Sequence, residues 1–349
     1  MNPHVSSPAS VALWSVAALT GAIVWGALAT WLALDFLRAR HRQAAREDLP
    51  ERHATEKAGT PSMGGLGLVP ALITGSLFAV IAFRQIAPSA NGGIGRLVPW
   101  LLALVAVSGV LGFLDDYTKT KNPKAKGLRP RYRLPVEIAA AVGFTLLVGK
   151  LAAQAGWHHH LPWPALGRAL PHWVAWYSIP LGVFAIVGAA NAVNLTDGLD
   201  GLAGGNVAFC ALGLAGMNLA QHRPELAACS LVLAGVATGF LWFNANPAQI
   251  WMGDTGALAL GAALGGIAVA SGLEIVLGLA GLVFVWETLS VIIQVIYFQS
   301  TGGKRLFRMS PFHHHLELSG WPENHIVLRS WLITAGCSLL AWVCVAGQV

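Results

Sequence analysis

Charged side chains are scarce in this sequence. Only 11% of its 349 residues are Asp, Glu, Lys or Arg, whereas soluble domains carry about a quarter. The four cysteines lie in apolar stretches without CxxC or Cys/His spacing, which argues against a disulfide framework or a zinc site. No polar stretch is long enough to close a core of its own, so we expect no separate soluble domain. With 55% hydrophobic residues, the sequence predicts an integral membrane protein.

Long apolar stretches run through the whole chain. A helix of about 20 apolar residues spans a bilayer, and ten stretches qualify as predicted spans. These spans are 11–36, 64–83, 97–114, 134–151, 173–190, 202–220, 226–243, 255–271, 275–298 and 326–346. No Lys or Arg precedes the first stretch, so we predict a span there and not a secretory signal peptide. The fold class is therefore all-α, a polytopic membrane protein with residues 1–349 in a single integral membrane domain.

The basic residues are distributed unevenly among the connections. The first basic cluster follows the first span, which predicts that the N-terminus is outside and the cluster inside. Ten spans then place both termini outside. With Arg329 included, 17 of the 22 Lys and Arg residues lie on the inner side. This bias predicts five cytoplasmic loops. They are residues 37–63, 115–133, 191–201, 244–254 and 299–325.

Aspartate is rare, and five of the seven Asp residues fall in three short motifs on the predicted inner side. These five are Asp115, Asp116, Asp197, Asp200 and Asp254. Acids at a membrane boundary cost free energy unless something pairs with them. A metal ion would offset that cost, and so would Lys119, which follows Asp115 by four residues and shares its face if the helix continues. The alternative for the first pair is a solvated helix end.

The second motif has a regular spacing. Asn191, Asn194, Asp197 and Asp200 recur every three residues, which on a helix places them along one polar wall. The alternative is an Asp/Asn/Gly turn. In the third motif, Asp254 precedes an apolar span, where it is expected to cap the helix N-terminus. Backbone N–H groups there could also face phosphate oxygens.

Carboxylate oxygens beside basic side chains are typical of Mg²⁺ bound to a diphosphate. Further polar residues occur near the end of the chain. His313, His314 and His315 form a run in which one or two could contact phosphate, although three consecutive helical side chains cannot all bind one metal ion. Glu287 lies within a predicted span, and Gln294 shares its helix face. Intramembrane acids are functional candidates, and structural hydrogen bonding is an equal alternative for this pair.

Five segments match one known family in register. They are Pro61-Ser62-Met63-Gly64-Gly65, Leu114-Asp115-Asp116-Tyr117, the stretch from Asn191 to Ala203, the stretch from Met252 to Gly256, and Pro311-Phe312-His313-His314-His315-Leu316-Glu317. The chain thus resembles the polyprenyl-phosphate N-acetylhexosamine-1-phosphate transferases from about Lys57 to Glu323. The triple-His segment favours the branch with a UDP-linked muramoyl-pentapeptide donor over the GlcNAc-1-phosphate branch.

The resemblance implies a bacterial inner (plasma) membrane enzyme of peptidoglycan biosynthesis with a cytoplasmic active site. It implies Mg²⁺, undecaprenyl phosphate as acceptor, UMP as second product and a homodimer in the lipid bilayer; we expect no nucleic acid among its partners. Its metal-binding Asp maps onto Asp254 and its aspartate pair onto Asp115 and Asp116, and its nucleoside pocket maps onto Lys57, Asn194, Asp200, Asn244 and Trp251. The candidate metal ligands are Asp254 and Asp116. The candidate catalytic residues are Asp115, Asp116, Asp254 and His313. The candidate substrate-binding residues are Lys57, Ser62, Lys119, Asn191, Asn194, Asp197, Asp200, Asn244, Trp251, Gln294, His314 and His315.

The expected reaction is attack of the lipid phosphate on the sugar-linked phosphorus. Asp115 or Asp116 would accept its proton or orient it, and a two-step route through an aspartyl phosphate stays open. A GlcNAc-1-phosphate transferase of the same family is the first alternative. A cation transporter is a weaker one, because transport predicts acids near mid-membrane, whereas these lie at the inner ends of spans.

Overall fold

The computed structural model describes residues 8–40, 59–86, 93–121, 127–154 and 175–347, and every structural statement below concerns these residues. They form twelve α-helices and one short 3-10 helix, which confirms the all-α prediction. The first helices are α1 (Pro8–Arg40), α3 (Gly65–Ile86), η2 (Gly93–Arg96), α4 (Val98–Lys121), α5 (Pro130–Gln154), α6 (Ala175–Thr196) and α7 (Leu202–Ala220). The others are α8 (Pro224–Asn244), α9 (Gly253–Ser271), α10 (Glu274–Ala280), α11 (Leu282–Ser300), α12 (Phe312–Leu318) and α13 (Glu323–Ala346).

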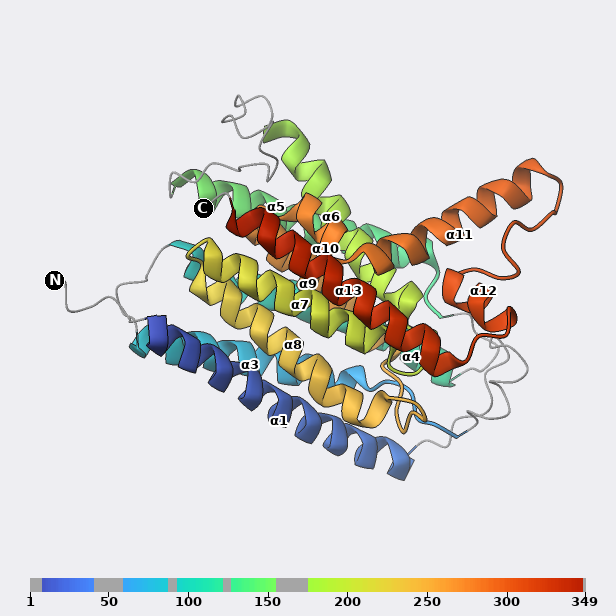
Figure 1. Cartoon of the computed structure of the whole chain (residues 1–349), viewed down its shortest axis with the longest axis horizontal. Helices are drawn as coiled ribbons and strands as arrows, with labels where there is room; N and C mark the ends of the chain where they lie inside the picture. Colours follow the sequence, from blue (N-terminus) through green and yellow to red (C-terminus); the bar gives the residue numbers. More distant parts are fainter. Residues whose placement is uncertain (1–7, 41–58, 87–92, 122–126, 155–174, 348–349) are drawn as a thin grey trace.

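Ten of these helices are long and apolar enough to cross a membrane, as predicted, and the protein is a multi-pass membrane protein. They are α1, α3, α4, α5, α6, α7, α8, α9, α11 and α13. They pack into one elongated bundle in which most helices run roughly along its length (Figure 1).

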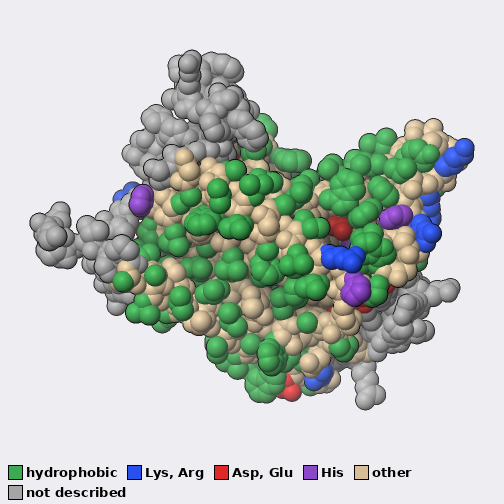
Figure 2. All heavy atoms as spheres, viewed as in Figure 1, with side chains coloured by type: hydrophobic (Ala, Val, Ile, Leu, Met, Phe, Trp, Pro, Cys, Tyr) green, Lys and Arg blue, Asp and Glu red, His purple; other side chains and the backbone are tan. Residues whose placement is uncertain are grey.

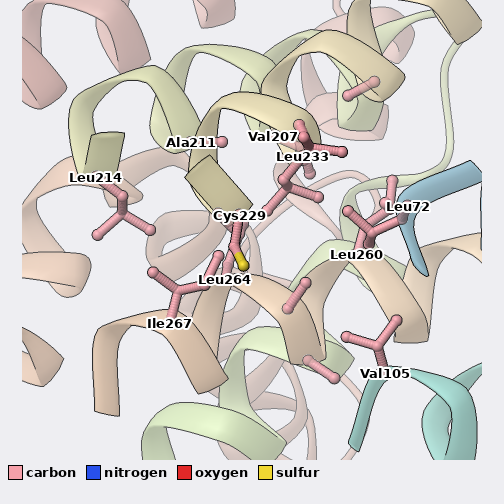
Figure 3. Close-up of a cluster of buried hydrophobic side chains, with 14 of the residues drawn as sticks. Leu72, Val105, Val207, Ala211, Leu214, Cys229, Leu233, Leu260, Leu264 and Ile267 are labelled. Atoms are coloured by element: carbon pink, nitrogen blue, oxygen red, sulfur yellow. The ribbon is translucent and has the colours of Figure 1, made fainter. Parts of the chain in front are cut away.

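Helix α9 lies at the centre of the bundle. In its most apolar stretch 89% of the residues are buried, against 17% in α1 on the outside. Its sequence, rich in Gly and Ala, allows α4 and α6 to pack closely on it, and a helix that is apolar all round is expected to be buried. Side chains from α3, α4, α7 and α8 fill the space around Leu260, Leu264 and Ile267 of α9 (Figure 3).

The predicted span 275–298 is wrong in one respect, because it is two helices. Gly281, with φ −99° and ψ 31°, ends α10 and precedes α11. Glycine has low helix propensity, and such residues are common sites of kinks. Beyond Gly281, α11 leaves the bundle, and the chain returns through α12 to α13 (Figure 1). Exposed side chains such as Trp286 and Ile296 follow from this departure.

Two helices continue past the ends of their predicted spans. Helix α4 runs to Lys121 instead of residue 114, and α6 runs to Thr196 instead of residue 190. Apolar length marks only the part of a helix inside the bilayer, whereas the backbone hydrogen bonds continue into polar residues. Asp115, Asp116, Asn191 and Asn194 therefore belong to helices and have fixed positions on their surfaces.

Candidate active site

Three carboxylates from two helices converge at one end of the bundle. Asp115 and Asp116 come from α4 and Asp254 from the first turn of α9, and one oxygen of each lies within 4.8 Å of the others. Gly112, one turn before Asp116, permits this approach, because a Cβ there would overlap the backbone oxygen of Asp254. Asp115 and Asp116 are buried, and Asp254 is partly exposed.

Asp116 caps the N-terminus of α9 from a different helix. Its Oδ1 accepts a hydrogen bond from the Asp254 backbone N–H at 3.1 Å. Its Oδ2 accepts from the Thr255 backbone N–H at 2.9 Å and from the Thr255 hydroxyl at 2.6 Å. The prediction that Asp254 is the cap is wrong: α9 starts at Gly253, and the cap position is Met252. The Asp254 side chain is therefore available for other contacts.

Lys119 bridges the other two carboxylates. Its Nζ forms an ion pair with Asp115 Oδ2 at 2.6 Å, as the spacing of four residues predicted, and donates to Asp254 Oδ2 at 3.0 Å. Asn194 Nδ2 donates to Asp254 Oδ1 at 2.8 Å, and the Leu128 backbone N–H donates to Asp115 Oδ1 at 2.6 Å. Asp115, Asp116 and Asp254 thus form a group that could hold a metal ion. Oxygen donors of this kind fit Mg²⁺.

Arg133 and Glu137, on the first turns of α5, are part of this site and were not predicted. Arg133 Nη1 lies 3.7 Å from Asp254 Oδ2, and Arg133 Nε forms an ion pair with Glu137 Oε1 at 3.0 Å. Asn191 of α6 contacts both residues through its amide. Glu137 lies inside a predicted span, so the rule that singled out Glu287 as an intramembrane acid would have found it.

The regular spacing from Asn191 to Asp200 is only partly helical. Helix α6 ends at Thr196, so Asn191 and Asn194 share the predicted wall, whereas Asp197 and Asp200 lie in the turn that follows. The prediction of a single four-residue wall is therefore wrong, and the alternative turn is correct for its second half. Glycine and aspartate favour such a turn over a continued helix.

Asp200 forms a second polar cluster with Asn244 and Trp251. Its Oδ2 accepts from the Ala248 backbone N–H at 3.0 Å, and its Oδ1 accepts from Trp251 Nε1 at 3.3 Å. Asn244 Oδ1 accepts from the Gly201 backbone N–H at 3.1 Å. These contacts tie the turn after α6 to the segment between α8 and α9. Of the predicted nucleoside pocket, Asn194 instead contacts Asp254, and Lys57 lies outside the described residues.

Ser62 lies in a segment that pairs with the entry to α9. The Trp251 backbone N–H donates to Pro61 O at 2.9 Å, and the Gly64 N–H donates to Trp251 O at 2.8 Å. Ser62 is buried between these bonds. The structure therefore brings the predicted Ser62 segment beside the first turn of α9.

The histidine run is held by α11. His313 donates its backbone N–H to Glu287 Oε2 at 3.2 Å, and its Nδ1 lies 3.1 Å from the same oxygen. Gln294 accepts from the Leu306 and Phe307 backbone N–H groups and donates to Phe307 O. Glu287 and Gln294 thus fasten the returning segment to α11.

The three imidazoles have different surroundings. Burial lowers the pKa of His313, which favours its neutral form. A Cβ on Gly198 would overlap that imidazole, so His313 lies against the turn after α6. His314 Nδ1 lies 3.2 Å from Glu317, and His315 Nδ1 accepts from the Arg308 backbone N–H at 3.1 Å. Basic, acidic and His side chains gather at this end of the molecule, on an otherwise largely apolar face (Figure 2).

The fold and the carboxylate group agree with the comparisons with known proteins. Residues 98–272, from α4 to the end of α9, match glycosyl transferase family 4, which defines the class of membrane transferase. A phospho-N-acetylmuramoyl-pentapeptide-transferase of Syntrophus aciditrophicus (strain SB) is 38% identical over 341 residues, covering 93% of this chain and 90% of the relative. Proteins of the same name from Bacillus thuringiensis (strain Al Hakam) and Bacillus cereus (strain AH187) are each 40% identical over 303 residues, covering 86% of this chain and 89% of theirs. The chain belongs to the phospho-N-acetylmuramoyl-pentapeptide-transferase family, which confirms the predicted resemblance.

Proposed function

We propose that this protein transfers phospho-N-acetylmuramoyl-pentapeptide from its UDP carrier to undecaprenyl phosphate, giving lipid I and UMP, in peptidoglycan synthesis. Membership of the family supports the activity. The single structural observation behind the proposal is the convergence of Asp115, Asp116 and Asp254 within 4.8 Å at one end of a membrane bundle. Carboxylate oxygens grouped in this way suit Mg²⁺ bound to a diphosphate.

Asp254 and Asp116 are the proposed Mg²⁺ ligands, with Asp115 beside them. Mg²⁺ bound there would stabilise negative charge on the phosphates of the donor. Lys119 supports this assignment, because its ammonium already lies between Asp115 and Asp254 and partly offsets their charge. A group of three carboxylates, two of them buried and only partly compensated, is expected to favour a divalent cation.

Asp115 is the stronger candidate for contact with the lipid phosphate. Asp116 accepts three hydrogen bonds from the first turn of α9, so its Oδ2 is committed to that helix and only Oδ1 keeps a lone pair, for the proposed metal ion. Asp115 Oδ2 contacts Lys119 and accepts no hydrogen bond from the described residues. In the transfer, an oxygen of the lipid phosphate bonds to the sugar-linked phosphorus, and the bond from that phosphorus to UMP breaks. Asp115 would accept or orient the proton of the attacking phosphate.

The remaining predicted residues are proposed to shape the donor site. Asp200, Asn244 and Trp251 hold the segment between α8 and α9, which supports a wall of the nucleoside pocket. Pro61 and Gly64, on either side of Ser62, form backbone hydrogen bonds with Trp251 in the same segment. Gln294 fastens the segment that carries His313, His314 and His315. The histidines are proposed to act on the donor side of the site, with His313 neutral.

The proposed orientation places the site at the cytoplasmic face of the inner membrane and both termini outside. The inward bias of Lys and Arg supports it. Residues 1–349 are proposed to form one integral membrane domain, with a homodimer as its assembly by analogy with the family.

The test is UMP release by the purified protein in detergent. Wild type should release UMP from the UDP-linked muramoyl-pentapeptide only with undecaprenyl phosphate and Mg²⁺ present. Asp254→Asn should lose this activity, because it removes a charged ligand, whereas Asp35→Asn on α1 should retain it. Full turnover by Asp254→Asn would overturn the metal assignment. Release from UDP-GlcNAc but not from the muramoyl donor would move the chain to the GlcNAc-1-phosphate branch.

A further inference from the structure

The guanidinium of Arg133 is held through two of its three nitrogens. Nε forms an ion pair with Glu137 Oε1 at 3.0 Å, and Nη2 donates to Asn191 Oδ1 at 2.7 Å. Nη1, the third nitrogen, lies 3.7 Å from Asp254 Oδ2, which is beyond hydrogen-bond distance. The planar geometry of the group therefore directs the Nη1 hydrogens toward the carboxylate group, where a phosphate oxygen could accept them.

The two residues that hold Arg133 also hold each other. Asn191 Nδ2 donates to Glu137 Oε2 at 2.8 Å and to Val187 O at 2.9 Å. Both N–H groups of this amide and its oxygen are thus committed to the protein. This argues that Asn191, predicted to bind substrate, acts through Arg133 and not by direct contact.

Glu137 is a buried carboxylate whose contacts all serve this arrangement. Its residue is 6% exposed, on a helix predicted to span the membrane. Burying a carboxylate is costly unless it is paired. Its Oε1 has the Arg133 ion pair but no hydrogen bond from the described residues, so it depends on that guanidinium.

We propose that Glu137 and Asn191 are positioning residues that direct Arg133 Nη1 to a phosphate oxygen of the UDP-linked donor beside Asp254. The proposal rests on the proposed function, since it names a contact within that site. A lysine at position 133 would keep the positive charge, but it has no planar guanidinium that Glu137 and Asn191 could hold through two nitrogens. The arrangement thus places a second fixed cation near Asp254 Oδ2, in addition to Lys119.

A double-mutant cycle tests whether Glu137 acts through Arg133. Glu137→Ala and Arg133→Ala should each lower kcat/KM for the donor about 10- to 100-fold, as for loss of a charge-assisted hydrogen bond. In the Arg133→Ala background, Glu137→Ala should change kcat/KM less than about threefold, since residues in one network are not additive. Asn191→Ala should likewise lower kcat/KM in the wild-type background but change it less than about threefold in the Arg133→Ala background. Multiplicative losses would overturn the proposal.

A matched control separates positioning from stability. Glu225 of α8 is also a buried acid, 2% exposed, with one oxygen lacking a hydrogen bond from the described residues. It lies near Arg84 and η2, at the opposite end of α8 from Asn244. Glu225→Ala should lower thermal stability as Glu137→Ala does, with near wild-type kcat/KM. Equal losses of kcat/KM in both variants would show a merely structural role.

Binding without turnover gives an independent readout. Arg133→Ala, Arg133→Lys and Glu137→Ala should weaken UDP binding, measured by calorimetry, about tenfold or more while leaving uridine binding unchanged. Glu137→Gln keeps one acceptor oxygen, so its UDP affinity should lie between those of wild type and Glu137→Ala. Wild-type UDP affinity in Arg133→Lys would overturn the proposal. If wild type releases no UMP from the muramoyl donor, the proposed function fails, and the UDP and uridine comparison still decides the role of Arg133.

Discussion

Replacement of Asp116 should damage the protein in a different way from replacement of its neighbour Asp115. Asp116 accepts hydrogen bonds from two backbone N–H groups and one hydroxyl of the first turn of α9. Asp116→Ala leaves these donors without a partner in a buried place, at a cost of about 1–3 kcal/mol for each donor. Loss of a negative charge at a helix N-terminus adds about 0.3–1 kcal/mol.

The expected loss in the free energy of unfolding for Asp116→Ala is therefore about 3–10 kcal/mol. Asp115 accepts one backbone hydrogen bond, from Leu128, and pairs with the partly exposed Lys119. Asp115→Ala should cost only about 1–2 kcal/mol. Both variants should lose most UMP release, Asp116→Ala through displacement of Asp254 and Asp115→Ala through loss of its own carboxylate.

Thermal unfolding of the detergent-purified variants, followed by tryptophan fluorescence, measures the difference. Asp116→Asn should lie between wild type and Asp116→Ala, because its amide keeps one acceptor oxygen. The reasoning is refuted if Asp116→Ala unfolds at the wild-type temperature, or if Asp115→Ala is the less stable of the two. Either result would mean that Asp116 does not hold α9 in place.

Three further predictions concern close packing and a partly buried acid. Gly112→Ala should lower both stability and UMP release because its Cβ overlaps the α9 backbone, whereas Gly143→Ala on α5, which meets nothing within 4 Å, should be neutral or slightly stabilising in the same assays. Gly198→Ala should displace the imidazole of His313, which should reduce the rate of UMP release while the unfolding temperature changes little. An unchanged rate of UMP release would contradict a role for that contact. Burial raises the pKa of Glu274 to about 7 from an ordinary value of 4.5, so the native state holds a proton that the unfolded chain releases, and stability should fall as pH rises from 4.5 to 7. At pH 8 the free energy of unfolding of Glu274→Gln should therefore exceed that of wild type by up to about 3 kcal/mol, with a higher unfolding temperature, whereas at pH 4.5 the two should not differ in this way.

Several local contacts followed from spacing alone. The pairing of Lys119 with Asp115 needs only a helix that continues for one more turn, and it does. The turn at Gly272, where φ is 64°, ends α9 at the last residue of its predicted span. The break at Gly281 was missed because apolar length does not distinguish one long helix from a short helix followed by a span.

The candidate site shows where sequence reasoning stops. Asp254 has the residue type and position of an N-cap, but Asp116 from α4 takes that role because the two helices meet at Gly112. Asp200 continues a helical spacing in the sequence but contacts Ala248 and Trp251 after the turn. In the sequence, Arg133 is one of many basic residues that are predicted to lie on the inner side, and only its partners in the structure set it apart.

The sequence by itself determined the number of membrane helices, the rarity of acids and the three motifs that contain them. These properties follow from hydropathy and residue type, which act locally along the chain. Only the tertiary structure decided which acid caps a helix, which acids could hold a metal ion, and which side chains position Arg133. These roles depend on how α4, α5, α6 and α9 pack, because a buried polar group takes the partner that lies within hydrogen-bond distance, wherever it falls in the chain.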